Sequence, residues 1–203
     1  FMNFFVREQV LVGILEKIDR EGDQYGKSAI GKGQRVQVEF VSANPTGPLH
    51  IGHARGAVIG DVISNILTAS GYSVSKEYYI NDVGKQMNTL GRSVLLRYKE
   101  LCGVQVEFPD DHYRGEYIYD LAREILAKEG KIYLDRDDQE TIRFFTKYAA
   151  DSILNGIKED LASFGVTFDR YFSEGELYKD NGVLGLLDQL KEKGYVFQEE
   201  DTV

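Results

Sequence analysis

The sequence predicts an α/β protein in which a parallel β-α-β layer is followed by a mainly helical region. Val36, Val38 and Phe40 alternate with polar residues, which is the period of a strand, and apolar residues then recur at helical spacing over 58–67. A second strand and a second amphipathic helix are predicted directly after them. This succession predicts parallel strands, with ligands bound beyond their carboxyl ends.

Composition and charge are those of an ordinary globular chain. Of its 203 residues, 42% are hydrophobic, and no apolar run approaches the roughly 20 residues that a membrane span needs. The single cysteine, Cys102, has no partner for a disulfide or a zinc site, so we expect a cytoplasmic protein that binds no membrane. The net charge of −9 argues against broad affinity for nucleic acid, and any RNA contact would need a local basic patch or parts outside this chain.

The first 34 residues predict a short helix and a connector. Apolar residues recur at helical spacing over 6–18, and a glycine-rich polar stretch without periodicity follows. We expect residues 1–34 to be the remnant of a preceding domain with its linker, and both ends of the chain to be cuts in a longer protein.

A stiff turn joins the first strand to the first long helix. The strand is predicted over 35–41 and the helix from near Gly52 to Ser70, with Gly71 in the position of a helix C-cap. Pro45 and Pro48 fix their own φ and push the residues before them towards extended conformations. The turn is therefore not a floppy connector.

The second strand is predicted over 74–80 and the second helix over 87–101, with polar residues between them. Asp82 either caps this helix or faces a substrate at the carboxyl ends of the strands. Gln86 and Lys85 are either solvated residues of the first helical turn or part of the same site.

After Val104 the predicted structure is mainly helical. Helices are predicted over 115–130 and, as one helix or as two joined near Asn155, over 141–164. A strand is predicted over 166–172, a capping box at Ser173 and Glu176, a last helix ending at Gly194 and a strand-like segment over 195–197. The charged residues and the Tyr and Phe side chains of this region are most simply a helical core with a solvated face, and none is assigned to catalysis.

The turn itself is the most informative stretch, because it places His50 and His53 at the start of a helix. A helix N-terminus leaves backbone N–H groups unpaired and carries partial positive charge, which suits a phosphate group. Gly52, Gly56 and Gly60 fall at four-residue intervals, so they share a helix face that a flat ring or a strand could approach. The alternative is that the glycines only allow tight packing and that the histidines are surface residues.

The motif His50-Ile51-Gly52-His53 resembles the HIGH signature of class I aminoacyl-tRNA synthetases. Its flanks, VEFVSANPTGPLHIGHARG and YYINDVGKQ, resemble the arginyl members of that class. The resemblance implies that residues 35–103 form the first half of a Rossmann-like, HIGH-type nucleotide-binding fold. Residues 104–203 would be a mainly helical connective insertion that returns towards the sheet and is truncated.

The resemblance also implies a reaction, the ATP-dependent activation of L-arginine and its transfer to tRNA(Arg). Because the substrate carboxylate is itself the nucleophile, the enzyme has only to align the reactants and stabilise charge on the phosphate. His50 and His53 would be catalytic, and they would bind ATP together with Gly52 and Gly56. Mg²⁺ would arrive with ATP, and no protein-bound metal is expected.

Glu39 is unusual in a parallel strand, which is apolar throughout when both its faces are covered. A buried carboxylate needs a cationic partner. The resemblance implies that this partner is the guanidinium group of arginine, with Ser42, Asn44 and His53 completing the arginine site and Asp82 and Gln86 as candidates on the substrate side. If the strand lies at a sheet edge, Glu39 is in water, and the residues alone favour that interpretation.

The second class I signature, Lys-Met-Ser-Lys-Ser, does not occur in the chain, and no lysine in 46–49 compensates for it. We therefore expect that signature beyond Val203 and expect the chain alone to be inactive. Another H-x-G-H nucleotidyltransferase and a non-catalytic relative that binds RNA or a partner protein are the alternatives. An anionic pocket at Glu39 beside His53 would favour the arginine enzyme, and basic patches would favour the RNA-binding relative.

Overall fold

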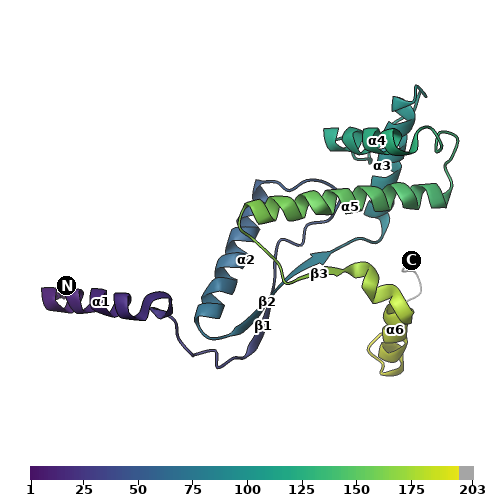
Figure 1. The fold of residues 1–203 in the computed structure, drawn as a ribbon. Helices are drawn as coiled ribbons and strands as arrows, with labels where there is room; N and C mark the ends of the chain where they lie inside the picture. The colour runs from purple at the N-terminus through teal and green to yellow at the C-terminus, as the bar shows by residue number, and fades with distance from the viewer. Residues whose placement is uncertain (197–203) are drawn as a thin grey trace.

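The structure is a computed structural model that describes residues 1–196 (Figure 1). Three strands form one sheet: β1 (Arg35–Glu39), β2 (Ser73–Ile80) and β3 (Arg170–Ser173). The α-helices are α1 (Glu8–Glu21), α2 (Ile51–Ala69), α3 (Lys85–Leu101), α4 (Glu116–Glu129), α5 (Gln139–Ser163) and α6 (Gly182–Glu192), with two 3₁₀ segments, η1 (Gly22–Gln24) and η2 (Glu174–Asn181). The predicted α/β class is confirmed.

The sheet is parallel throughout, in the order β1-β2-β3. Helix α2 makes the crossover from β1 to β2, and α3, α4 and α5 together lie between β2 and β3. Central strand β2 buries Tyr78 and Ile80, whereas β1 lies at an edge of the sheet formed by residues 1–196. The carboxyl ends of the strands therefore face the turn at 42–50 and the segment after Ile80.

Strand β1 ends at Glu39, two residues before the predicted end. Val41 and Ser42 adopt positive φ angles of 65° and 41°, which no extended strand allows. A β-branched residue in this conformation is strained, and such strain persists only where the surroundings hold it. The chain therefore leaves the sheet abruptly and enters the turn.

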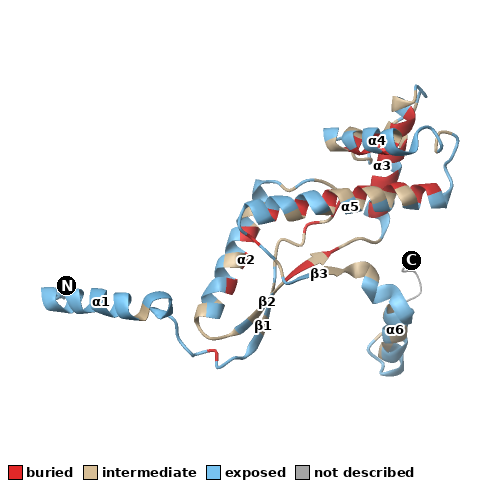
Figure 2. Cartoon of the chain, in the orientation of Figure 1, coloured by how far each residue is buried: buried red, intermediate tan, exposed pale blue. Residues whose placement is uncertain are grey.

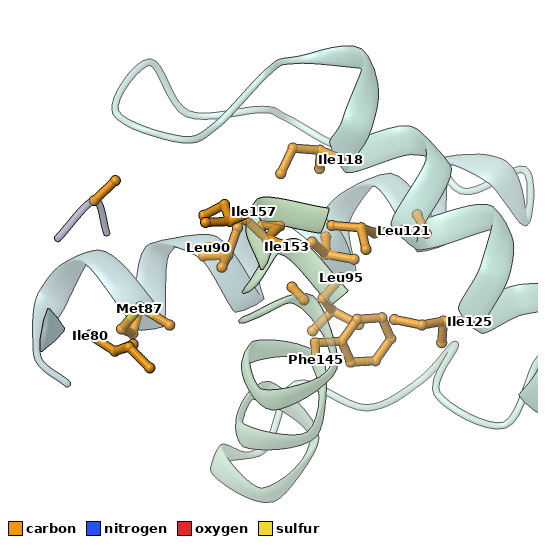
Figure 3. Packing of buried hydrophobic residues seen from close by; sticks show 14 of the residues in the cluster. Ile80, Met87, Leu90, Leu95, Ile118, Leu121, Ile125, Phe145, Ile153 and Ile157 are labelled. Atoms are coloured by element: carbon orange, nitrogen blue, oxygen red, sulfur yellow. The ribbon is translucent and has the colours of Figure 1, made fainter. Parts of the chain in front are cut away.

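The hydrophobic core lies mainly between α3, α4 and α5 (Figures 2 and 3). In Figure 3, Leu95 of α3 lies near Leu121 of α4 and Phe145 of α5, and Leu90 of α3 lies near Ile157 of α5. Helix α3 approaches α5 closely at Gly91, where a Cβ atom would lie 2.8 Å from a backbone carbonyl oxygen of α5. Helix α5 is a single helix of 25 residues, which settles the alternative of two shorter ones.

Two predictions after residue 165 are wrong. Strand β3 begins at Arg170 and not at 166. Val166 is buried in the core, and the side-chain Oδ2 atom of Asp169, not a backbone carbonyl, accepts the N–H of Lys76 of β2 at 2.8 Å. Ser173 does not cap η2, since its hydroxyl donates to Asp82 instead. The strand-like segment predicted over 195–197 reaches past the described residues.

Helix α1 buries no residue and extends away from the sheet in Figures 1 and 2. Helix α2 turns its small residues, Ala57, Gly60 and Ser64, inwards and leaves its larger apolar side chains exposed. Within residues 1–196, no helix combines the length and the apolar character that crossing a membrane requires.

Candidate functional site

The turn at 42–50 is held by contacts from two neighbouring elements. Within the turn, Pro45 is fully buried. The hydroxyl of Tyr78, from β2, donates to the carbonyl of Ala43 at 2.8 Å, and the hydroxyl of Tyr117, from α4, donates to the carbonyl of Thr46 at 2.7 Å. Burial raises the pKa of Tyr78 to about 12, so this hydroxyl stays protonated and able to donate. Two separate elements thus hold the backbone of the turn.

His50 and His53 form a reciprocal cap at the start of α2. The Nδ1 atom of His50 accepts the N–H of Gly52 at 3.1 Å, and the Nδ1 atom of His53 accepts the N–H of His50 at 3.2 Å. The two rings stack with centroids 3.8 Å apart. This arrangement satisfies two of the N–H groups that a helix start leaves unpaired, as a capping box does.

The cap also fixes where each imidazole carries its proton. Because Nδ1 accepts a backbone N–H in both His50 and His53, the neutral rings carry their hydrogen on Nε2. Partial burial and the neighbouring His50 ring lower the pKa of His53 below its ordinary value of 6.5. His53 is therefore neutral at pH 7, with an Nε2–H group free to donate.

A cavity of about 440 Å³ lies beside the two imidazoles. Its walls include Asn44 and the turn residues as well as Tyr113 and Tyr117 from the helical region. The sequence held no signal for these two tyrosines, because they lie at least 60 residues beyond the histidines and match no motif. Of the predicted site residues, Asn44, His50 and His53 share this cavity.

Glu39 is exposed and lies on an edge strand of the sheet formed by residues 1–196, so its carboxylate is not buried as expected. Its Oε1 atom accepts the hydroxyl of Ser42 at 2.9 Å, and the same hydroxyl oxygen accepts the N–H of Tyr79 at 3.1 Å. Ser42 therefore ties the end of β1 to β2. Within the described residues, the Glu39 carboxylate has no cationic partner.

Asn44 and Gln86 join the turn to the start of α3. The Nδ2 atom of Asn44 donates to Oε1 of Gln86 at 2.8 Å. Asp82 does not cap α3, whose N-cap is Gly84 and which has no side-chain cap. Its carboxylate instead accepts the hydroxyl of Ser173 and, at 2.9 Å, the N–H of Gly175. Asp82 thus links the end of β2 to the segment that begins at the end of β3.

The glycines of α2 serve different purposes. A Cβ atom at Gly60 would collide with the ring of Phe40, so this position permits the helix to pack closely on the residue that follows β1. A Cβ atom at Gly52 would lie 2.9 Å from the His50 ring, so this glycine leaves room for the stacked histidines. Nothing lies within 4 Å of a Cβ atom at Gly56, where the helix face is open.

Metal ligands do not gather in this part of the molecule. Among residues 1–196, no three His, Cys, Asp or Glu side chains are placed to hold a metal ion together.

The comparison with known families supplies the context for this site. A family model described as tRNA synthetases class I (R), catalytic domain, matches residues 15–203. This chain belongs to the arginyl-tRNA synthetase family. The predicted class I synthetase fold, the first half of its nucleotide-binding domain with a mainly helical insertion, is confirmed by this match and by a solved structure.

The relatives in the arginyl-tRNA synthetase family are longer than this chain. The arginine–tRNA ligases of Geobacter sp. (strain M21) and Syntrophotalea carbinolica are 50% and 51% identical to it over 203 residues, and the chain spans 37% of the length of each. A crystal structure from Campylobacter jejuni described as an arginyl-tRNA synthetase has a TM-score of 0.83 and 37% identity, covering 96% of this chain and 42% of that one. The Thermus thermophilus arginyl-tRNA synthetase, 22% identical over 98% of this chain and 32% of that one, shares the fold with a TM-score of 0.57.

Proposed function

We propose that this chain carries the HIGH half of a site that, in the full-length protein, activates L-arginine with ATP and transfers it to tRNA(Arg). The supporting observation is the stacked pair of His50 and His53, whose Nδ1 atoms are occupied and whose Nε2 atoms have no hydrogen-bond partner among the described residues, beside a cavity of about 440 Å³. Two fixed Nε2–H donors at a helix N-terminus suit a phosphate whose negative charge grows in the transition state.

In the proposed reaction, a carboxylate oxygen of arginine attacks the α-phosphorus of ATP. The new bond joins that oxygen to phosphorus, and the bond from phosphorus to the bridging oxygen breaks, with its electron pair leaving on pyrophosphate. No proton is transferred, so neither histidine acts as a base. His50 and His53 donate from Nε2 to the phosphate oxygens, and Mg²⁺ enters as the ATP complex.

The arginine side of the site is proposed to use Glu39, Ser42 and Asn44. Glu39 is exposed, and one of its oxygens already accepts the Ser42 hydroxyl, so its remaining lone pairs can receive a planar guanidinium group. Asn44 lies on the same turn as the histidines and lines their cavity. Its amide, oriented by Gln86, is suitably placed for the ammonium or carboxylate end of the substrate.

We also propose that the 203-residue chain does not catalyse alone. The cavity beside the histidines is open to solvent, and no second signature closes it. In water of high dielectric, hydrogen bonds to a developing phosphate charge are weakened several-fold. Measurable arginyl-tRNA formation by this chain, above that of its His53→Ala variant, would contradict this proposal.

The test is arginine-dependent exchange of pyrophosphate into ATP by a full-length protein that contains this chain, with tRNA(Arg) present. We expect exchange with arginine and at least about a hundredfold less with lysine, because only a guanidinium group pairs with a carboxylate through two parallel bonds. Nucleotide transfer that ignores arginine would favour another H-x-G-H nucleotidyltransferase. RNA binding without any exchange would favour a non-catalytic relative.

A further inference from the structure

One residue of the helical region reaches directly into the HIGH turn. Tyr117, in the first turn of α4, donates its hydroxyl to the carbonyl of Thr46 at 2.7 Å, across 71 positions of sequence. Its ring folds back over Gly115, the N-cap of α4, where a Cβ atom would collide with it. The side chain is half-buried and forms part of the wall of the cavity beside the histidines.

The contact falls on the segment of the turn that leads into the histidine pair. Thr46 is followed by Gly47, then by Pro48 and Leu49, and then by His50. Pro48 fixes its own φ and pushes Gly47 towards an extended conformation, so the short segment between Thr46 and His50 is stiff. A displacement of Thr46 is therefore passed on to the histidines. The hydroxyl of Tyr117 lies 3.2 Å from where a Cβ atom of Gly47 would be, so the tyrosine packs against the segment directly before the histidine pair.

The hydroxyl of Tyr117 is chemically suited to donate to the carbonyl of Thr46. Burial and the nearby Tyr113 raise its pKa above the ordinary value of 10.0, so it remains a donor at neutral pH. Tyr78 anchors the turn at Ala43. Tyr117 anchors the stretch between Ala43 and Leu49, at Thr46. If Tyr117 released Thr46, the segment from Thr46 to Leu49 would lack that anchor.

We propose that Tyr117 is a positioning residue that acts through His50 and His53, an inference that rests on the proposed function of the pair. It holds Thr46 and Gly47 so that the two Nε2–H groups stay aligned on the phosphate. Displacements of about an ångström in such an alignment are enough to slow a reaction greatly. The helical region thereby contributes to catalysis through the turn, without touching the reacting atoms.

The kinetic test replaces Tyr117 by Phe in the full-length protein, which keeps the ring and removes only the hydroxyl. We expect kcat for arginine-dependent pyrophosphate exchange to fall about tenfold, with KM for ATP and arginine changed by less than about twofold, because alignment matters most in the transition state. Tyr119→Phe is the matched control. Tyr119 lies on the same helix and donates to Glu100, away from the turn, so its variant should keep wild-type kcat.

A double-mutant cycle separates positioning from ordinary stabilisation. If Tyr117 acts through the histidines, adding Tyr117→Phe to the His53→Ala variant should lower kcat by less than about twofold relative to His53→Ala alone. Full additivity of the two losses would overturn the inference. A rise in KM for either substrate with kcat unchanged would also overturn it, because the tyrosine would then contact substrate directly.

Amide hydrogen exchange gives a readout that does not depend on activity. In Tyr117→Phe, the peptide that covers residues 43–50 should exchange faster than in wild type, whereas the end of α2 should not change. If wild type shows no arginine-dependent exchange, the proposed function fails, and the hydrogen-exchange result still decides whether Tyr117 holds the turn. Unchanged protection of 43–50 would overturn the inference in either case.

Discussion

His50 and His53 stack on each other with ring centroids 3.8 Å apart, and the Nδ1 atom of His53 accepts the backbone N–H of His50 at 3.2 Å. The motif histidines are therefore structural caps of α2 as well as candidate catalytic donors. This double role explains why the spacing of three residues matters. The first and fourth residues of a capping box are the two that can reach each other's backbone.

Replacing either histidine by alanine should lower kcat more than it changes binding. In the full-length protein, we expect His50→Ala and His53→Ala to reduce kcat for pyrophosphate exchange by about two orders of magnitude or more, with smaller effects on KM for ATP. Loss of a cap costs about 1 kcal/mol, so the fold should survive. The control is His112→Ala, which removes the chain's third histidine; wild-type exchange in both motif variants would contradict the assignment.

Acid should weaken the site through His53. Its pKa in the folded protein lies below the ordinary value of 6.5 that it has in the unfolded chain. Between the folded and the unfolded pKa, the unfolded chain binds more protons, so the stability of the fold falls as the pH drops through that window. Protonated His53 also loses the Nδ1 acceptor of the cap. We expect the acid limb of kcat to have its midpoint below pH 6.5 and the melting temperature to fall less in His53→Ala than in wild type over the same range. A midpoint above 6.5 would show that another group controls the acid limb.

Glu39→Gln should weaken arginine binding selectively. The substitution keeps an acceptor for the Ser42 hydroxyl and removes the charge, so the affinity for arginine should fall by about 2 kcal/mol or more while that for ATP barely changes. Isothermal titration of each substrate measures both. Parallel loss of both affinities would indicate a folding defect, and an unchanged arginine affinity would place specificity at another residue.

Asp82→Ala should destabilise the fold and spare substrate binding. The variant removes the acceptor of the Ser173 hydroxyl and the Gly175 N–H, which costs about 1 to 3 kcal/mol of unfolding free energy. Denaturant unfolding measures the loss. Asp82→Asn should recover part of it, because its carbonyl oxygen can still accept the Gly175 N–H. A rise in KM for arginine without a loss of stability would instead support the substrate-side role considered from the sequence.

The 203-residue chain should self-associate through α2. Five apolar residues on the outer side of this helix are between 45% and 59% exposed: Val58, Ile59, Val62, Ile63 and Ile66. In addition, β1 lies at an edge of the sheet formed by the described residues. Sedimentation velocity at increasing concentration should show association that the double variant Ile59→Lys, Ile63→Glu reduces. A monomer at all concentrations in the unsubstituted chain would contradict this prediction.

Most of the elements were predictable because their signals are local. Alternation in β1 and helical spacing after the turn placed the first β-α-β layer, and Gly71 takes the positive φ expected at the end of α2. The boundaries were less predictable. Val41 has the β-branched side chain typical of a strand, but the hydrogen bonds of Ser42 to Glu39, Tyr79 and the carbonyl of Phe40 form a turn there that ends β1.

The sequence by itself determined the class of fold, the HIGH turn and the pair of histidines at the start of α2. The tertiary structure decided which side of α2 faces the sheet, that Glu39 lies in water, that Asp82 bonds to Ser173, and that Tyr117 holds the turn. Hydrophobic period is a property of neighbouring residues, so a sequence displays it directly. Contacts across 71 or 91 positions depend on how whole helices pack, and no local pattern encodes them.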